Sequence, residues 1–282
     1  MPQTINTNIA SLNAQRNLNA SQSSLATAMQ RLSSGMRVNS AKDDAAGLAI
    51  AERMNAQVRG MNVAIRNAND GISLAQTAEG ALSKVGDSLQ RMRELAVQAR
   101  NATNSSSDKD SLNKEFVELQ AEISRVLGGT TFNGANILGA DATAMTFQIG
   151  ANTTSDDIIT VQTTDMKSAT QITLVTGTSS AIDATATNGA IATVIDNIDA
   201  ALDTVNDTRA TFGATQSRFD AIISNLQQSV ENQAAARSRI MDADFAAETA
   251  SMSRAQILQQ AGTAMVAQAN QLPQQVMQLL QG

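Results

Sequence analysis

Residues 54–92 read MNAQVRGMNVAIRNANDGISLAQTAEGALSKVGDSLQRM, and apolar side chains recur in them at steps of three and four residues. Side chains with this spacing fall on one face of an α-helix. Prolines occur only at positions 2 and 273, so nothing between them forces a helix to break. The stretch therefore predicts one long helix with a continuous apolar face. That face contains Met54, Val58, Met61, Ile65, Ala68, Ile72 and Ala75, followed less regularly by Leu82, Leu89 and Met92.

Two further central stretches repeat this pattern, one within residues 108–128 and one within 190–240. Together with a helix over about 44–100, they predict a mainly α fold, built as a long antiparallel helical coiled-coil bundle or rod. An intramolecular bundle accounts for all three apolar faces. The two further faces include Leu112, Phe116, Leu119, Ile123 and Val126, and then Ile191, Ile195, Ile198, Leu202 and Val205.

The pattern changes between residues 129 and 176, where apolar and polar side chains alternate. The runs MTFQI at 145–149 and IITVQT at 158–163 alternate with period two, which indicates strands. Asn133-Gly134 is a turn sequence. We expect a small β-hairpin region over about 129–176, followed by a short surface linker over 177–190.

Local signals also mark where helices end and begin. Gly35 follows the last leucine of an N-terminal apolar pattern and is expected to cap that helix at its C-terminus. Asp108 or Ser111 is expected to cap the start of the helix over 108–128.

The composition excludes several classes of enzyme. The chain has no cysteine and no histidine, which rules out Ser-His-Asp and Cys-His nucleophiles and nearly all zinc sites. A carboxylate-only site stays possible, but paired acids serve more often as turn, cap or subunit-contact residues. We therefore expect no catalytic residue, no metal and no cofactor. The acidic pairs are Asp43-Asp44, Asp156-Asp157 and Asp242/Asp244.

Charge and hydropathy narrow the possible partners. A net charge of −6 argues against nucleic-acid binding, and no apolar run is long enough to insert into a membrane. The N-terminus MPQTINTNIASLNAQR has neither the early basic residue nor the apolar run of a secretory signal peptide. The sequence predicts a cytoplasmic chain or one exported by a route that reads another feature.

The two ends of the chain are unusually poor in charge. Residues 1–40 contain three arginines and no acid, and residues 255–282 contain no charged side chain. Both ends carry apolar patterns that predict two paired terminal helices. Their remaining faces would be covered either by other copies in an assembly or by the central bundle, and the residues leave both open. The apolar positions are Ile5, Ile9, Leu12, Leu18, Leu25 and Leu32, and then Leu258, Gly262, Met265, Ala269, Leu272, Val276 and Leu279.

Six segments of the sequence resemble bacterial flagellin, the subunit of the flagellar filament, and they occur in that family's order. They are TINTNIASLNAQRNL at 4–18, LSSGMRVNSAKDDAAGLAIAERM at 32–54, LQRMRELAVQAR at 89–100, TTFNGANIL at 130–138, RSRIMDADFAAETASMSRAQILQQAG at 237–262 and LPQQVMQLL at 272–280.

The resemblance implies a layered filament subunit. Residues 1–43 and 242–282 would form paired helices in an inner tube, and residues 44–241 would form a rod domain with no separate outer domain. The apolar positions of the two ends would then be the assembly residues, and the charge-free helix would lie among neighbouring subunits. Truncating about twenty residues at either end is expected to abolish filament formation and leave the rod folded.

The resemblance also implies partners and a location. Flagellins are exported unfolded through the flagellum's own type III apparatus, without a cleaved signal peptide, into an extracellular filament of many copies. An export chaperone would bind the C-terminal segment, and cap and hook-junction proteins would contact the filament. As monomers, some flagellins bind a vertebrate innate receptor, for which Arg91, Leu95 and Glu115 match the contact positions.

Two other readings of the chain stay open at this point. A hook–filament junction protein shares similar termini but differs in the rod, and the segment at 32–54 favours flagellin over it. An unrelated helical secreted protein would not need both ends to match.

Overall fold

We describe the protein from a computed structural model, which defines the backbone of residues 7–281 and the side chains of residues 7–271. These residues form six α-helices, a 3-10 helix and two small antiparallel sheets of two strands each. The predicted mainly α fold with a small β-hairpin region is therefore confirmed. The chain divides into two compact units, residues 57–230 and residues 1–56 with 231–282.

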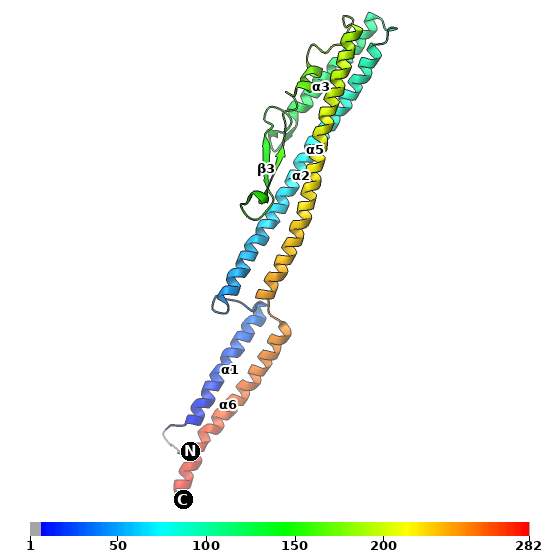
Figure 1. The fold of residues 1–282 in the computed structure, drawn as a ribbon. Coiled ribbons are helices and arrows are strands. Elements are labelled where there is room, and N and C mark those ends of the chain that lie inside the picture. Colours follow the sequence, from blue (N-terminus) through cyan, green and yellow to red (C-terminus); the bar gives the residue numbers. More distant parts are fainter. Residues whose placement is uncertain (1–6, 282) are drawn as a thin grey trace. The chain divides into compact units, whose positions relative to one another are not determined.

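Three helices build the unit 57–230, namely α2 (Ala45–Ala99), α3 (Ser106–Gly129) and α5 (Asn188–Met241) (Figure 1). Their apolar faces enclose a large main core, as expected for an intramolecular bundle, and a separate small cluster contains Met61, Ala64 and Leu226. At Gly71 the helices come so close that an added Cβ would lie 2.6 Å from Cζ of Phe219. The largest fully buried side chains include Phe116, Phe212, Phe219, Leu74, Leu82, Leu89, Met92 and Leu95.

The start of α3 is fixed by a reciprocal cap. Ser105 is the N-cap residue, and its hydroxyl accepts a hydrogen bond from the backbone N–H of Asp108. The Asp108 carboxylate in turn accepts from the backbone N–H of Ser105 at 2.9 Å. The helix therefore begins just before the predicted residue, and Asp108 takes part in the cap from inside the first turn.

Two hairpins follow α3. Strands β1 (Thr131–Phe132) and β2 (Ala135–Asn136) are joined by Asn133 and Gly134, both with positive φ, as a two-residue hairpin turn requires. Strands β3 (Ala144–Gln148) and β4 (Ile158–Gln162) pair antiparallel, and the 3-10 helix η1 (Ser155–Asp157) lies in their connection.

The stretch after the hairpins is more ordered than a surface linker. A short helix α4 (Thr170–Thr176) precedes it, and Ile182 is completely buried. The amide of Gln120 on α3 donates to the carbonyls of Val175 and Ser180, at 2.7 and 2.9 Å. Asn113 accepts from the backbone N–H of Ile182 at 3.0 Å. Polar side chains of α3 therefore hold this segment against the core.

The other unit contains α1 (Ile9–Ser34) and α6 (Phe245–Gln281), which lie side by side and antiparallel (Figure 1). Helix α1 ends at Gly35 in the left-handed conformation, so the predicted cap is confirmed. The segments 35–44 and 242–244, here called the joint, connect the pair to α2 and α5.

Backbone hydrogen bonds tie the two segments of the joint together. Arg37 N–H donates to the carbonyl of Met241 at 2.6 Å, and Ala243 N–H donates to that of Gly35 at 2.9 Å. Val38, Ala51 and Met241 form a small core beside these bonds. Because of this core, the first turns of α2 belong to the terminal unit. The predicted boundary between inner-tube and rod domains, at residues 43 and 242, describes positions in the filament and stays a prediction.

Candidate assembly interface

Helices α1 and α6 pack closely through small side chains. On α1 the buried positions are Ser11, Ser21 and Ala28, and on α6 they are Ala255 and Ala269. Between them, an added Cβ on Gly262 would lie 3.1 Å from Cδ1 of Leu18. Small side chains let two helix backbones approach, so the pair has a narrow contact rather than a thick apolar core.

Polar contacts close the pair at both ends. Asn8 caps α1 and also donates from its amide to the carbonyl of Ala269 at 2.7 Å. The hydroxyl of Ser11 donates to the side-chain oxygen of Asn270 at 2.7 Å. Near the joint, Arg31 and Glu248 form an ion pair at 3.8 Å. These contacts fix how far each helix is shifted along the other.

Large apolar side chains of both helices face outward instead. On α6, Leu258 is 53% exposed and Met265 is 62% exposed. Globular monomers usually turn such side chains toward a core. Among the side chains that the structure describes, the pair therefore carries apolar surface that stays exposed. The other exposed members are Ile9, Leu12 and Met29 on α1 and Ile257 and Phe245 on α6.

The apolar pattern predicted as one seam on α6 is divided between two faces. Gly262 packs against Leu18 of α1 and Ala269 is buried, whereas Leu258 and Met265 are more than half exposed and line a groove beside α1. The physical reason is that close packing selects the smallest side chains for the contact. Leu18, Leu25 and Leu32 are half-buried, and Ile9 and Leu12 are exposed. Ile5, Leu272, Val276 and Leu279 lie outside the described side chains.

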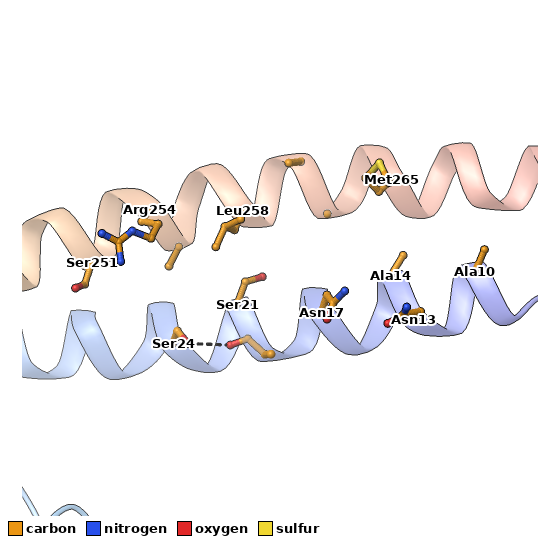
Figure 2. A pocket seen from close by; sticks show the side chains of 14 residues that line it. Ala10, Asn13, Ala14, Asn17, Ser21, Ser24, Ser251, Arg254, Leu258 and Met265 are labelled. Carbon is orange, nitrogen blue, oxygen red and sulfur yellow. Dashed lines mark hydrogen bonds between the residues drawn. The ribbon is translucent and has the colours of Figure 1, made fainter.

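A groove of about 900 Å³ runs along one side of the pair (Figure 2). Its α1 wall consists of side chains no larger than asparagine, and its α6 wall carries Arg254, Leu258 and Met265. Ser24 on the α1 wall is held by a hydrogen bond from its hydroxyl to the carbonyl of Ala20, at 3.0 Å. The α1 wall consists of Ala10, Asn13, Ala14, Asn17, Ala20, Ser21 and Ser24.

The charges of the pair are few and uneven. Arg254 is the only charged residue between 249 and 282, and Arg16 is the only one between 1 and 30. Among the described side chains, neither arginine has an ion-pair partner. Acids gather toward the joint, at Asp242, Asp244 and Glu248. The pair is thus cationic away from the joint and acid-bearing beside it.

The three receptor-matched residues of α2 and α3 lie in different environments. Arg91 donates to Glu115 at 2.7 Å and to Glu94 at 2.9 Å, and the three side chains are 50%, 47% and 67% exposed in that order. The hydrogen bond from Arg91 lowers the pKa of the Glu115 carboxyl below its ordinary 4.5. Leu95 is 1% exposed and belongs to the core. The ion pair is therefore accessible in the single chain, whereas Leu95 is not.

The acidic pairs considered as metal ligands are mostly engaged in caps. Asp43 accepts hydrogen bonds from the hydroxyl and backbone N–H of Ser40, which lower the pKa of its carboxyl. Asp44 accepts from the N–H of Gly47, and Asp244 accepts from those at the start of α6. Among residues with described side chains, no group of three or more potential ligands could hold a metal ion. None of the described helices is long and apolar enough to cross a membrane.

Sequence reasoning missed the residues that bring the pair together. The contact uses Ser11, Ser21 and Ala28, which do not stand out among many small polar residues. A detectable signal was present, because Ala14, Ser21 and Ala28 repeat every seven residues beside the leucines of the same helix. The groove-lining Arg254 was identifiable as the last charge before the charge-free end.

A rigid helical unit joined to a charge-poor pair with uncovered apolar faces defines a structural subunit built for self-assembly. Comparison with known proteins gives the family. Residues 5–143 match the bacterial flagellin N-terminal helical region, and residues 195–280 match the bacterial flagellin C-terminal helical region.

Individual relatives agree with this match. A flagellin of Halalkalibacterium halodurans is 46% identical over 284 residues, covering 98% of this chain and 99% of that relative. A flagellin of Xenorhabdus nematophila is 44% identical over 315 residues, covering 99% and 100%. The crystal structure of Bacillus cereus flagellin is similar with a TM-score of 0.50 and 35% identity, covering 61% of this chain and 94% of that one.

The chain belongs to the bacterial flagellin family. It is a structural subunit of the flagellar filament, a homopolymer exposed outside the cell. The resemblance found in six sequence segments is confirmed, and nothing in these comparisons favours the hook–filament junction alternative.

Proposed function

We propose that the α1–α6 pair is the part of the subunit that forms the filament's inner tube, within residues 1–43 and 242–282. The observation that carries this proposal is the uncovered apolar surface at Ile9, Leu12, Leu258 and Met265. Leu18, which lies next to Gly262, and the half-buried Leu25 and Leu32 belong to the same apolar pattern, and Ile5, Leu272, Val276 and Leu279 continue it. Residues 44–241 are proposed as the rod domain, without a separate outer domain.

Burial of the outward faces supplies the driving force for assembly. Each leucine-sized side chain transferred from water contributes about 1.5–3 kcal/mol. The loss of conformational entropy in the ordered ends offsets much of this gain. Assembly is therefore expected to be reversible by acid or heat.

Seeded growth tests this proposal. Purified protein is heated to dissolve fibres, short seeds are added at neutral pH, and growth is followed by negative-stain electron microscopy. The full chain is expected to form long uniform tubes. Chains lacking about twenty residues at either end are expected to stay monomeric. Normal tubes from a truncated chain would contradict the assignment of the ends.

We also propose that the exposed face of α6 is recognised before assembly. In this proposal the unfolded chain is exported through the flagellar type III apparatus without a cleaved signal peptide, and an export chaperone covers its apolar C-terminal segment. Leu258 and Met265, with Leu272 and Leu279 further along, form an amphipathic face that such a partner can grip. Replacing Leu258 and Met265 by Gln is expected to weaken chaperone binding in calorimetry, and unchanged affinity would exclude them.

Cap and hook-junction proteins are further proposed partners of the assembled filament. The chain is proposed to act structurally and not as an enzyme, without metal or cofactor. In support, Asp43, Asp44 and Asp244 serve as caps of turns and helices.

Recognition of the monomer by the vertebrate flagellin receptor is proposed at Arg91 and Glu115. The buried Leu95 would support this site through its packing in the core. The ion pair is accessible in the single chain, whereas Leu95 supports the helix surface through packing. Arg91→Ala is expected to weaken receptor activation by monomer in a reporter assay. Arg125→Ala, which removes an exposed ion pair elsewhere on α3, is the control. Equal potency of the two variants would reject the site.

A further inference from the structure

The α6 wall of the groove differs in polarity between its two ends (Figure 2). At the end nearer the joint, this wall contains Ser251 and Arg254. Toward the other end it contains Leu258, Ala261 and Met265. A surface that changes along its length from hydrogen-bond donors to apolar side chains suits an elongated ligand that is polar at one end and apolar along the rest.

The polar end of the groove carries a positive charge. Arg254 is the only charged residue in the lining, and it has no ion pair among the described side chains. The acid that precedes it on α6, Glu248, pairs with Arg31 instead. A guanidinium presents several donors and forms charge-assisted hydrogen bonds with carboxylates. The polar end therefore favours an anionic headgroup, for which the Ser251 hydroxyl, one turn earlier, offers a further donor.

The apolar part of the groove sets the length of the ligand. Arg254 and Met265 are eleven residues apart on one helix, which is about three turns and a rise of about 16 Å. A saturated chain of about twelve carbon atoms has a similar extended length, at about 1.3 Å per bond along its axis. The facing α1 wall contains no side chain larger than asparagine, so it leaves room for such a chain.

We propose that the groove binds a single-chain anionic amphiphile, a fatty carboxylate such as dodecanoate, with its carboxylate on Arg254 and its chain along Leu258 and Met265. The inference concerns the monomeric protein and does not depend on the proposed place of the α1–α6 pair in the filament. Because the lining side chains are exposed, only part of the alkyl chain leaves water on binding. The affinity for dodecanoate is therefore expected to be moderate, and Arg254 is expected to select an anion over a cation.

Two adjacent residues of α6 test the apolar wall. Leu258 lines the groove, whereas Ile257 is 66% exposed and does not line it. Equilibrium dialysis of the unseeded full-length monomer against dodecanoate, kept below its micelle-forming concentration, measures the dissociation constant. Leu258→Gln is expected to weaken binding by about tenfold or more, and Ile257→Gln by less than about twofold. Equal losses in the two variants would indicate unspecific adsorption to exposed side chains and overturn the proposal.

Two arginines test the polar end in the same assay. Arg254 lines the groove and Arg16 does not, and neither has an ion pair among the described side chains. Arg254→Gln is expected to weaken dodecanoate binding by about threefold or more at low salt, and added salt is expected to reduce this difference. Arg16→Gln is expected to bind like the parent chain. Equal affinity of the parent for dodecyltrimethylammonium, which has the same chain and the opposite charge, would overturn the role of Arg254.

Two controls complete the experiment. Circular dichroism checks that the variants keep their helices, which is expected because each substituted side chain is exposed. Vesicles of phosphatidylglycerol present the same charge on a membrane surface. Binding of the monomer to these vesicles without binding of dodecanoate would indicate a membrane surface as the occupant and overturn the proposal. No binding of dodecanoate to the parent chain would overturn it as well, and would leave the inner-tube assignment standing, since seeded growth tests that separately.

Discussion

The two units of this flagellin use their apolar residues in opposite ways. In the unit 57–230, the phenylalanines at 116, 212 and 219 are at most 1% exposed and share one core. In the α1–α6 pair the buried positions are small, and Leu258 and Met265 face outward. The first unit encloses its large apolar side chains, whereas the second leaves several of them exposed in the single chain.

Their charges differ in the same sense. Residues 57–230 contain twelve basic and nineteen acidic residues, and the remainder of the chain contains eight basic and seven acidic residues. Net negative charge keeps a protein surface solvated and discourages unspecific association. The near-neutral terminal unit lacks this protection and suits burial among other copies.

The largest expected effect on the folded monomer comes from Phe219→Ala. Phe219 is fully buried, and its ring meets that of Phe147 edge-on at 5.8 Å. Removing it leaves a cavity that is expected to cost about 3–5 kcal/mol. Urea unfolding of monomer measures this loss, and Met265→Ala serves as the control from the other unit. A loss for Met265→Ala as large as that for Phe219→Ala would remove the distinction between the units.

A smaller effect is expected from Gly71→Ala in the same core. The new methyl group would lie 2.6 Å from Phe219, and such overpacking costs about 1–3 kcal/mol. Gly80→Ala on the same helix meets no atom within 4 Å, and better helix propensity is expected to stabilise it by about 0.5–1 kcal/mol. Thermal unfolding followed by circular dichroism compares the two. Equal shifts in the unfolding temperature of the two variants would mean that α2 does not approach Phe219 as described.

The double variant Leu258→Gln/Met265→Gln tests the α1–α6 pair in the same comparison. Both side chains are exposed in the single chain, so monomer stability is expected to change by less than about 0.5 kcal/mol. The concentration of free monomer in equilibrium with filaments is expected to rise by about tenfold or more, because apolar contact with neighbours is lost. Sedimentation after seeding measures it. A less stable monomer with unchanged assembly would reverse the roles of the two units.

The smallest effect concerns acid. Five carboxyls of the unit 57–230 have a lowered pKa, and for Glu115 the main cause is the hydrogen bond from Arg91. A carboxyl whose pKa is lowered in the folded protein stabilises the fold at pH values above its pKa in the unfolded chain, which is 4.5 for glutamate. This contribution disappears as pH falls through the folded-state pKa. Glu115→Gln is therefore expected to flatten slightly the loss of stability as pH falls below 4.5. Parallel curves of stability against pH for variant and parent would show that the Arg91–Glu115 ion pair contributes nothing to this pH dependence.

Several local features of the fold could be predicted because they depend on neighbouring residues alone. The apolar spacing from Met54 to Met92 predicts α2, and Asn133-Gly134 predicts the turn of the first hairpin. Gly35 predicts the end of α1. Prediction was weaker at 177–190, where the distant side chains of Asn113 and Gln120 hold the segment in place.

The candidate site could be predicted only in outline. The lack of charge after residue 254 indicates that α6 needs protein around it, and this follows from sequence alone. The pattern from Leu258 to Leu279, however, defines an apolar stripe wider than one contact. In the structure Gly262 lies in close contact with α1 and Ala269 is buried, and Leu258 and Met265 stay exposed along the groove of the pair.

Local sequence was thus sufficient to predict the helices, their caps and the family, since each depends on a few adjacent side chains or on their order. Three-dimensional packing determined which faces are covered, buried Leu95 in the core and left the groove beside Arg254 open. The physical reason is that periodicity shows which side chains avoid water. Which surface each of them meets depends on steric fit between segments as distant as Leu18 and Gly262.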